Sequence, residues 1–116
     1  MNDKTAPLTY YTDSTERRYL RISTNFSVRV FHDAKPTLGR GHDLGAGGMA
    51  IYVPLELATG TLVSLSFQLP YSRMILGVRA RVRNSEGFRY GVEFVDLTLA
   101  ELQEIKRITA ILELTA

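Results

Sequence analysis

Residues 74–95, MILGVRARVRNSEGFRYGVEFV, decide the fold of this chain. Polar and apolar side chains alternate along the first half, as in a strand with one solvent face and one core face. The alternating positions are Arg79, Arg81 and Arg83 on one face and Val78, Ala80 and Val82 on the other. We interpret the arginine face as solvated, because any half-buried strand alternates in this way, although it can also line a ligand or partner surface. Residues 88–95 supply a second strand, and NSEG at 84–87 predicts a hairpin in which Gly87 is left-handed.

The same pattern places four more strands ahead of this hairpin. In the first of them, Phe26, Val28 and Val30 alternate with polar residues. The four expected strands cover residues 22–31, 38–44, 48–53 and 61–69, with a turn at residues 33–36. Several short strands joined by turn signals predict an all-β fold, either a barrel or a sandwich.

The last segment changes to a helical period. Thr98 and Glu101 have the spacing of a capping box, in which each side chain bonds the other residue's backbone NH. The expected apolar stripe is Leu99, Leu102, Ile105, Ile108 and Leu112, with Glu104, Lys106 and Arg107 outside it. We predict a helix over about residues 98–113 that plugs one open end of the sheet. A coiled-coil dimer is disfavoured because the stripe covers only about two heptads.

Composition indicates a single domain without disulfide or cysteine chemistry. The 116 residues suffice for one hydrophobic core and not for two, and cysteine is absent. The N-terminus lacks the apolar run of a signal peptide and no segment has transmembrane length, so we expect a cytoplasmic protein without membrane insertion. Residues 1–15 are polar and aperiodic, which predicts a flexible tail ahead of a domain covering residues 16–116.

Two short segments carry residues suited to a ligand. ERRYLR at residues 16–21 places two arginines four residues apart, and an arginine fork can bind phosphate or stack on a nucleobase. DLGAGG at residues 43–48 places Asp43 before glycines that permit positive φ and close approach of the backbone. A carboxylate can accept from the paired NH and amino donors of guanine, which adenine lacks. Together the segments predict a site for guanine and phosphate.

At these residues the chain resembles the PilZ domain family, whose signature is R-x-x-x-R in an N-terminal arm and D-x-S-x-x-G on the first strands of a barrel. The first motif is intact at residues 17–21. The second keeps Asp43 and Gly48 but has Gly45 where the family usually has serine. YGVEF at residues 90–94 is similar to the family's last-strand signature. The resemblance runs from about Glu16 to the C-terminal helix, and order and spacing make it more specific than either motif alone.

The resemblance implies a fold, a ligand and a mechanism. The fold is a six-stranded antiparallel split barrel with a C-terminal capping helix and a flexible N-terminal arm. The ligand is the bacterial second messenger cyclic di-GMP, as one nucleotide or a stacked pair, with no cofactor besides it. The arm closes over the ligand and passes the signal to a protein partner that the sequence does not name. The residues implied to bind the ligand are Arg17, Arg18, Arg21, Asp43, Gly45 and Gly48.

The resemblance also implies a role for each of these residues. Arg17 and Arg21 clamp phosphates and stack on guanine, while Arg18 assists or faces solvent. Asp43 reads the guanine edge, and Gly48 holds the turn. Loss of the family serine's hydrogen bond costs about 1 kcal/mol, or roughly fivefold in affinity, so we expect weakened binding.

Catalytic and metal-binding signatures are absent from the sequence. His32 and His42 are the only histidines, they lack H-E-x-x-H spacing, and we expect both to be surface strand residues. The chain has no G-x-S-x-G elbow, no P-loop and no G-x-G-x-x-G fingerprint. Glu93 lies amid apolar neighbours, and a strand glutamate facing solvent explains it. We expect neither an enzyme nor a metal site.

Two other functions stay open. The first is a degenerate PilZ-like adaptor that binds no nucleotide and uses residues 79–83 or the helix for protein contacts, with Gly45 as its support. The second is a barrel that binds single-stranded nucleic acid, which requires aromatic side chains among basic ones on the strand faces. We expect no DNA or RNA partner, because the aromatic residues fall mostly at core or strand-end positions. These residues are Phe67, Phe88, Tyr90 and Phe94. The expected state is a monomer or a weak homodimer.

Overall fold

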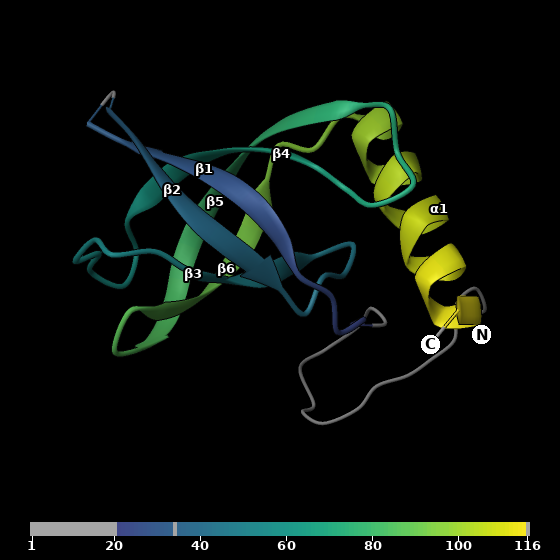
Figure 1. Cartoon of the computed structure of the whole chain (residues 1–116). Coiled ribbons are helices and arrows are strands. Elements are labelled where there is room, and N and C mark those ends of the chain that lie inside the picture. Colours follow the sequence, from purple (N-terminus) through teal and green to yellow (C-terminus); the bar gives the residue numbers. More distant parts are fainter. Residues whose placement is uncertain (1–20, 34, 116) are drawn as a thin grey trace, which may run out of the picture.

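Six strands form a barrel and a single helix follows them in the computed structural model, which describes residues 21–33 and 35–115. The expected tail at residues 1–15 lies outside the described residues. The elements are β1 (Phe26–His32), β2 (Lys35–His42), β3 (Gly48–Tyr52), β4 (Leu62–Gln68), β5 (Ile75–Glu86), β6 (Arg89–Val95) and α1 (Leu99–Thr115). All neighbouring strands are antiparallel and close in the order β1-β2-β3-β6-β5-β4 (Figure 1). The predicted all-β barrel is confirmed.

The barrel interior is built by the alternation visible in the sequence. Val78, Ala80 and Val82 of β5 are buried, while the three arginines between them lie on the outer face. Phe26, Val28 and Val30 of β1 fill the same interior, as do Val63, Leu65 and Phe67 of β4. Full burial of such a side chain contributes about 1.5–3 kcal/mol, so this interior is the main source of stability.

The β5–β6 hairpin has a shorter turn than the four residues predicted for it at 84–87. Glu86 pairs with Arg89, which leaves Gly87 and Phe88 as a two-residue turn. Gly87 has a φ of 62°, as predicted, because this turn requires a left-handed residue. The register shifts between Val82 and Asn84, so a β-bulge leaves one residue of β5 without a partner in β6.

The expected turn at residues 33–36 is partly wrong. Lys35 pairs with His32 and Pro36 with Phe31, so both belong to β2. Asp33 adopts a φ of 59°, and this left-handed residue lets the chain reverse early enough for the ladder to start at Lys35. Strand β2 consequently begins three residues before the expected Leu38 and ends at His42 rather than at Leu44.

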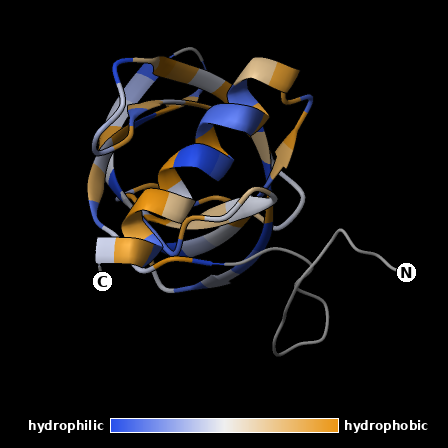
Figure 2. Ribbon diagram, turned by 90° about the vertical axis from the view of Figure 1, so that its right-hand side faces the viewer, coloured by the Kyte–Doolittle hydropathy of each residue, from blue (hydrophilic) through white to orange (hydrophobic). Residues whose placement is uncertain are grey.

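Helix α1 lies across one end of the barrel, as expected (Figures 1 and 2). The capping box is present: Glu101 N donates to Thr98 Oγ1 at 3.1 Å, and Thr98 N donates to Glu101 Oε1 at 2.9 Å. Ile105 and Ile108 are fully buried in the barrel core, with Leu112 packed partly against it. The middle of the outward face is hydrophilic (Figure 2). No helix among the described residues is long and apolar enough to cross a membrane.

Two predictions for α1 are wrong. Leu99 is 68% exposed, because the first helical turn precedes the part that packs over the barrel. Glu104, expected on the outside, has a side chain only 12% exposed and accepts hydrogen bonds from Arg107 and from the Ser72 hydroxyl. These two bonds hold the pKa of Glu104 down at about 2. Through Ser72, the β4–β5 loop is tied to the helix.

Candidate functional site

The start of the described chain meets the β2–β3 turn, although the two are distant in sequence. Arg21 Nε donates to the backbone oxygen of Asp43 at 2.7 Å. Next to it, Ile22 and Leu44 exchange backbone hydrogen bonds of 2.8 and 2.9 Å. The structure thus brings Arg21 and Asp43 together, one residue from each predicted motif. Arg17 and Arg18 lie outside the described residues.

Gly48 is required by close packing of the backbone. A Cβ on this residue would lie 2.1 Å from the Val92 carbonyl oxygen of β6, far inside contact distance. Gly48 pairs with Glu93 in the β3–β6 ladder, so the clash is with backbone that the ladder holds in place. Gly48 is thus the first residue of β3, where close approach of β6 requires glycine, and its role in holding the turn stays a prediction.

The β2–β3 turn takes its left-handed residue from Asp43 rather than from a glycine. Asp43 has a φ of 49°, a conformation that aspartate tolerates better than most residues. Gly45 is buried, and its NH donates to the Gly48 oxygen at 2.9 Å. Backbone hydrogen bonding therefore orders the turn, and the left-handed φ of Asp43 sets the direction in which its side chain leaves the backbone.

The Asp43 carboxylate has a partner that the sequence did not indicate. Arg89 at the start of β6 donates through Nη2 to Asp43 Oδ2 at 2.8 Å. The Arg89 guanidinium carbon lies 5.9 Å from the centre of the Tyr52 ring, and the His42 ring meets Tyr52 edge-on at 5.0 Å. Tyr52 and Arg89 face each other in the β3–β6 ladder. The expectation that His42 lies at the surface of a strand holds, but its ring supports this cluster.

The arginines of β5 are all engaged on the outer face of the barrel. Arg79 binds Asp96, Arg81 Nη1 donates to the Gly60 oxygen at 3.0 Å, and Arg83 Nε donates to Glu93 Oε1 at 2.6 Å. Glu93 faces solvent as predicted, with a side chain 54% exposed. These contacts favour the interpretation of this face as a solvated surface with exposed ion pairs.

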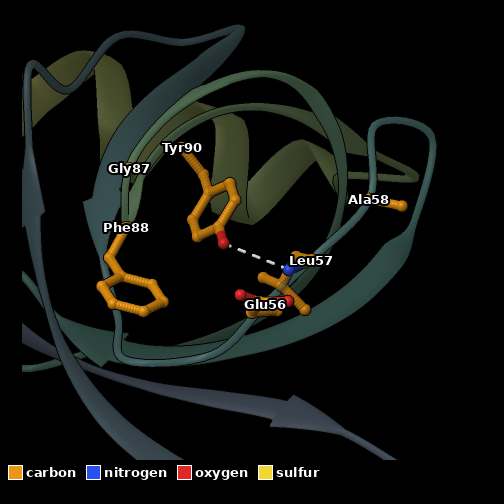
Figure 3. A pocket seen from close by; sticks show the side chains of 6 residues that line it. All are labelled: Glu56, Leu57, Ala58, Gly87, Phe88 and Tyr90. Carbon is orange, nitrogen blue, oxygen red and sulfur yellow. Dashed lines mark hydrogen bonds between the residues drawn. The ribbon is translucent and has the colours of Figure 1, made fainter.

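A cavity of about 460 Å³ lies at the end of the barrel beside the β5–β6 turn (Figure 3). Its lining includes Phe88, Tyr90 and Glu56. The Tyr90 hydroxyl accepts from Leu57 N at 3.1 Å and donates to the Leu55 oxygen at 2.5 Å, so its hydrogen-bonding capacity is used by the backbone. The one charged side chain here is a carboxylate, which disfavours a phosphate ligand in this cavity.

The remaining predictions concern metal ions and aromatic side chains. The described part of the chain contains no cluster of three or more His, Asp or Glu residues that could hold a metal ion.

Phe67 and Tyr90 are buried, and Phe94 packs against the core. Phe88 is 51% exposed but lies in a turn. Of the four aromatic residues considered in the sequence, three therefore belong to the core or pack against it.

Comparison with known families agrees with the fold. Residues 15–110 match the PilZ domain family model, which covers most of the chain. The chain therefore belongs to the PilZ domain family. No curated protein matches it.

Solved structures show the same barrel. The PilZ domain of CeSA from a cellulose-synthesizing bacterium has a TM-score of 0.61 and 23% identity, and the match covers 78% of this chain and 96% of that one. The PilZ domain of YcgR from Escherichia coli, solved with c-di-GMP, has a TM-score of 0.69 and 20% identity over 85% and 92% of the two chains. A longer YcgR structure in complex with c-di-GMP reaches 0.72 and 24%, over 84% of this chain and 46% of that one. This chain thus corresponds to about half of that protein, and the likeness concerns the fold.

Proposed function

We propose that this chain is a receptor for cyclic di-GMP, bound on the outer wall of the barrel beside the β2–β3 turn. The observation that carries the proposal is the contact between Arg21 and Asp43, 22 positions apart, which joins the two motifs at one place. Membership of the PilZ family and the c-di-GMP in the two YcgR structures support the choice of ligand.

Asp43 is proposed to read guanine, and its geometry suits that task. Its side chain is 38% exposed and Oδ2 accepts one bond from Arg89, whereas Oδ1 accepts none from the described residues. A carboxylate offers about four lone-pair sites, which leaves room for the guanine NH and amino donors. Arg17 and Arg21 are proposed to clamp phosphates and stack on guanine, with Arg18 assisting. Gly45 and Gly48 are proposed to shape the turn.

Titration calorimetry of the full chain tests this proposal. We expect saturable binding of cyclic di-GMP and much weaker binding of cyclic di-AMP, because adenine lacks the paired donors that Asp43 would accept. Arg17→Ala is expected to weaken binding about tenfold or more, since a hydrogen bond to a charged group contributes about 1.5–3 kcal/mol. Absence of heat and saturation at high ligand concentration would contradict the proposal.

The proposed output is closure of the N-terminal arm over the ligand. In the cytoplasm, the closed arm would present a new surface to a protein partner, with the receptor as a monomer or weak homodimer. Hydrogen exchange of residues 10–22 measures this directly, and we expect greater protection when cyclic di-GMP is added. Unchanged protection with bound ligand would exclude arm closure while leaving the receptor function intact.

A second candidate is a nucleotide-free adaptor that acts through protein contacts. Two observations favour it: Gly45 replaces the family serine, and Arg89 already binds the Asp43 carboxylate. If wild type shows no binding and Gly45→Ser gains it, the adaptor is supported. Saturable binding by wild type rules it out.

A further inference from the structure

We propose that Arg89 is a positioning residue of the cyclic di-GMP site, which holds the Asp43 carboxylate in the orientation that accepts guanine and thereby sets selectivity for that base. This inference rests on the proposed function, since it assumes that Asp43 is the group that reads the nucleobase. Arg89 itself acts through Asp43 and does not need to touch the ligand.

The contact between the two residues orients the carboxylate without covering it. Arg89 Nη2 reaches a single oxygen, Oδ2, at 2.8 Å. Both side chains are partly exposed, 35% for Arg89 and 38% for Asp43, so the carboxylate is accessible from solvent. Guanine presents two adjacent donors, which need two acceptor sites on one side of the carboxylate. A single bond to Oδ2 leaves these sites available.

Arg89 is in turn held by the strands on which the site is built. Its guanidinium lies over Tyr52, its neighbour in the β3–β6 ladder, and the Tyr52 ring meets His42 of β2 at an interplanar angle of 87°. A guanidinium over an aromatic ring is attracted by the ring electrons. The series His42, Tyr52, Arg89 and Asp43 therefore connects three neighbouring strands to one carboxylate.

An orienting partner matters because of where Asp43 sits. The residue lies in a turn after β2 ends, not in a strand whose ladder would fix its side chain. A carboxylate without a partner has to be ordered when the ligand binds, and that ordering lowers affinity. Arg89 supplies this order in advance, which favours the ligand that needs both acceptor sites over one that needs a single site.

A double-mutant cycle tests the inference in the full chain. The variants are Arg89→Met, Asp43→Gly and the double variant, and glycine is chosen because it accepts the left-handed φ of position 43. The probes are cyclic di-GMP and cyclic di-IMP, which retains the ring NH but lacks the exocyclic amino group. The matched control is Arg79→Met, because Arg79 also donates through Nη2 to an aspartate Oδ2, that of Asp96.

We expect Arg89→Met to weaken cyclic di-GMP binding about fivefold to tenfold and to lower its preference over cyclic di-IMP. In the Asp43→Gly background the same change should have no further effect, and Arg79→Met should change neither affinity. Tighter binding by Arg89→Met would overturn the inference, because Arg89 would then compete with the ligand. Equal losses for both nucleotides in both backgrounds would also overturn it. If wild type binds no cyclic di-GMP, the proposed function itself is contradicted. If wild type binds but the Arg89 and Asp43 substitutions act independently, only the role of Arg89 is contradicted.

Discussion

The barrel carries the same ion pair at two places, and the difference between them is instructive. In both pairs an arginine Nη2 donates to an aspartate Oδ2, and in both the aspartate is left-handed, with φ of 49° at Asp43 and 60° at Asp96. The Arg79–Asp96 side chains are 53% and 65% exposed, whereas those of Arg89 and Asp43 are 35% and 38% exposed. In the second pair the Arg89 guanidinium lies over the Tyr52 ring, and Arg21 binds the backbone of Asp43.

The two pairs show that an arginine and an aspartate in contact do not define a binding site by themselves. The Arg79–Asp96 pair lies where β6 leads into α1, more than half of each side chain is exposed, and such exposed pairs contribute little. The Arg89–Asp43 pair lies where three strands and the incoming N-terminal segment converge. The surroundings, not the pair, make Asp43 a candidate for ligand binding.

The largest expected effect is a loss of stability, caused by a substitution that displaces the backbone near Asp43. We expect Gly48→Ala to lower the free energy of unfolding by about 3 kcal/mol, because its Cβ would overlap the Val92 oxygen. The matched control is Gly77→Ala on β5, where a Cβ meets nothing within 4 Å. Urea unfolding monitored by circular dichroism measures both. Equal and small losses of stability in the two variants would show that the β6 backbone can move away from the added Cβ.

Next in size is removal of each aspartate in turn. Asp43→Gly is expected to weaken cyclic di-GMP binding roughly tenfold to a hundredfold, because hydrogen bonds to a charged group contribute about 1.5–3 kcal/mol. Asp96→Gly keeps the left-handed conformation and should leave affinity unchanged. Calorimetric titration of the two variants decides the comparison. Similar losses in both would mean that the ligand does not distinguish the two pairs.

A smaller gain is expected beside Asp43. Gly45→Ser should tighten binding by about fivefold, since a neutral hydrogen bond contributes about 1 kcal/mol. The backbone NH that donates to the Gly48 oxygen is retained in this variant. The measurement is again a titration with cyclic di-GMP. Unchanged or weaker binding would show that a hydroxyl at this position does not reach the ligand.

Smaller still is the contribution of each ion pair to stability. We expect a coupling free energy of about 0.5 kcal/mol or less for Arg79–Asp96, reduced further by salt. For Arg89–Asp43 we expect about 1 kcal/mol, since the pair is less exposed and the cation–π contact with Tyr52 restrains the arginine. Double-mutant cycles of urea unfolding at low and high salt measure both values. Equal coupling free energies would show that the two ion pairs do not differ in their contribution to stability.

The last prediction concerns Glu104, a carboxylate that Arg107 and Ser72 hold at the other end of the barrel. These bonds lower its pKa from 4.5 to about 2, so the folded state binds the Glu104 proton less readily than the unfolded state. The stabilisation is present above about pH 4.5 and is lost as the pH falls toward about 2. The stability difference between wild type and Glu104→Gln should therefore shrink across this window. A constant difference from pH 7 to pH 2 would contradict the assignment.

The sequence predicts the parts of this fold that local periodicity controls. The alternation around Val78 and Val82, the left-handed Gly87 and the capping box at Thr98 are all confirmed. The start of β2 was placed too late, because a left-handed Asp33 shortens a turn in a way that composition does not show. Leu99 was placed in the core, because helical spacing does not indicate where the barrel rim ends.

The candidate site could be predicted only in part. Asp43 and Gly48 were found through their motif, but Arg89 was not, because it lies 46 positions from Asp43. Their contact depends on the β3–β6 register, and that register is set by the barrel as a whole. The sequence did show Arg89 between Phe88 and Tyr90, at an outward position of β6. This alternation predicts that the Arg89 side chain points out of the barrel, but it does not predict which residue it contacts.

Closure of the barrel also restricts how a partner can attach. Each of the six strands has a neighbour on both sides for at least part of its length, so none of the strands described is an edge strand. A peptide or a second copy cannot add a full-length strand to this sheet unless a ladder first separates. The β2–β3 ladder pairs three residues, fewer than any other, and it ends at His42, beside Asp43. The shortest ladder of this barrel therefore adjoins the residue proposed to read the messenger.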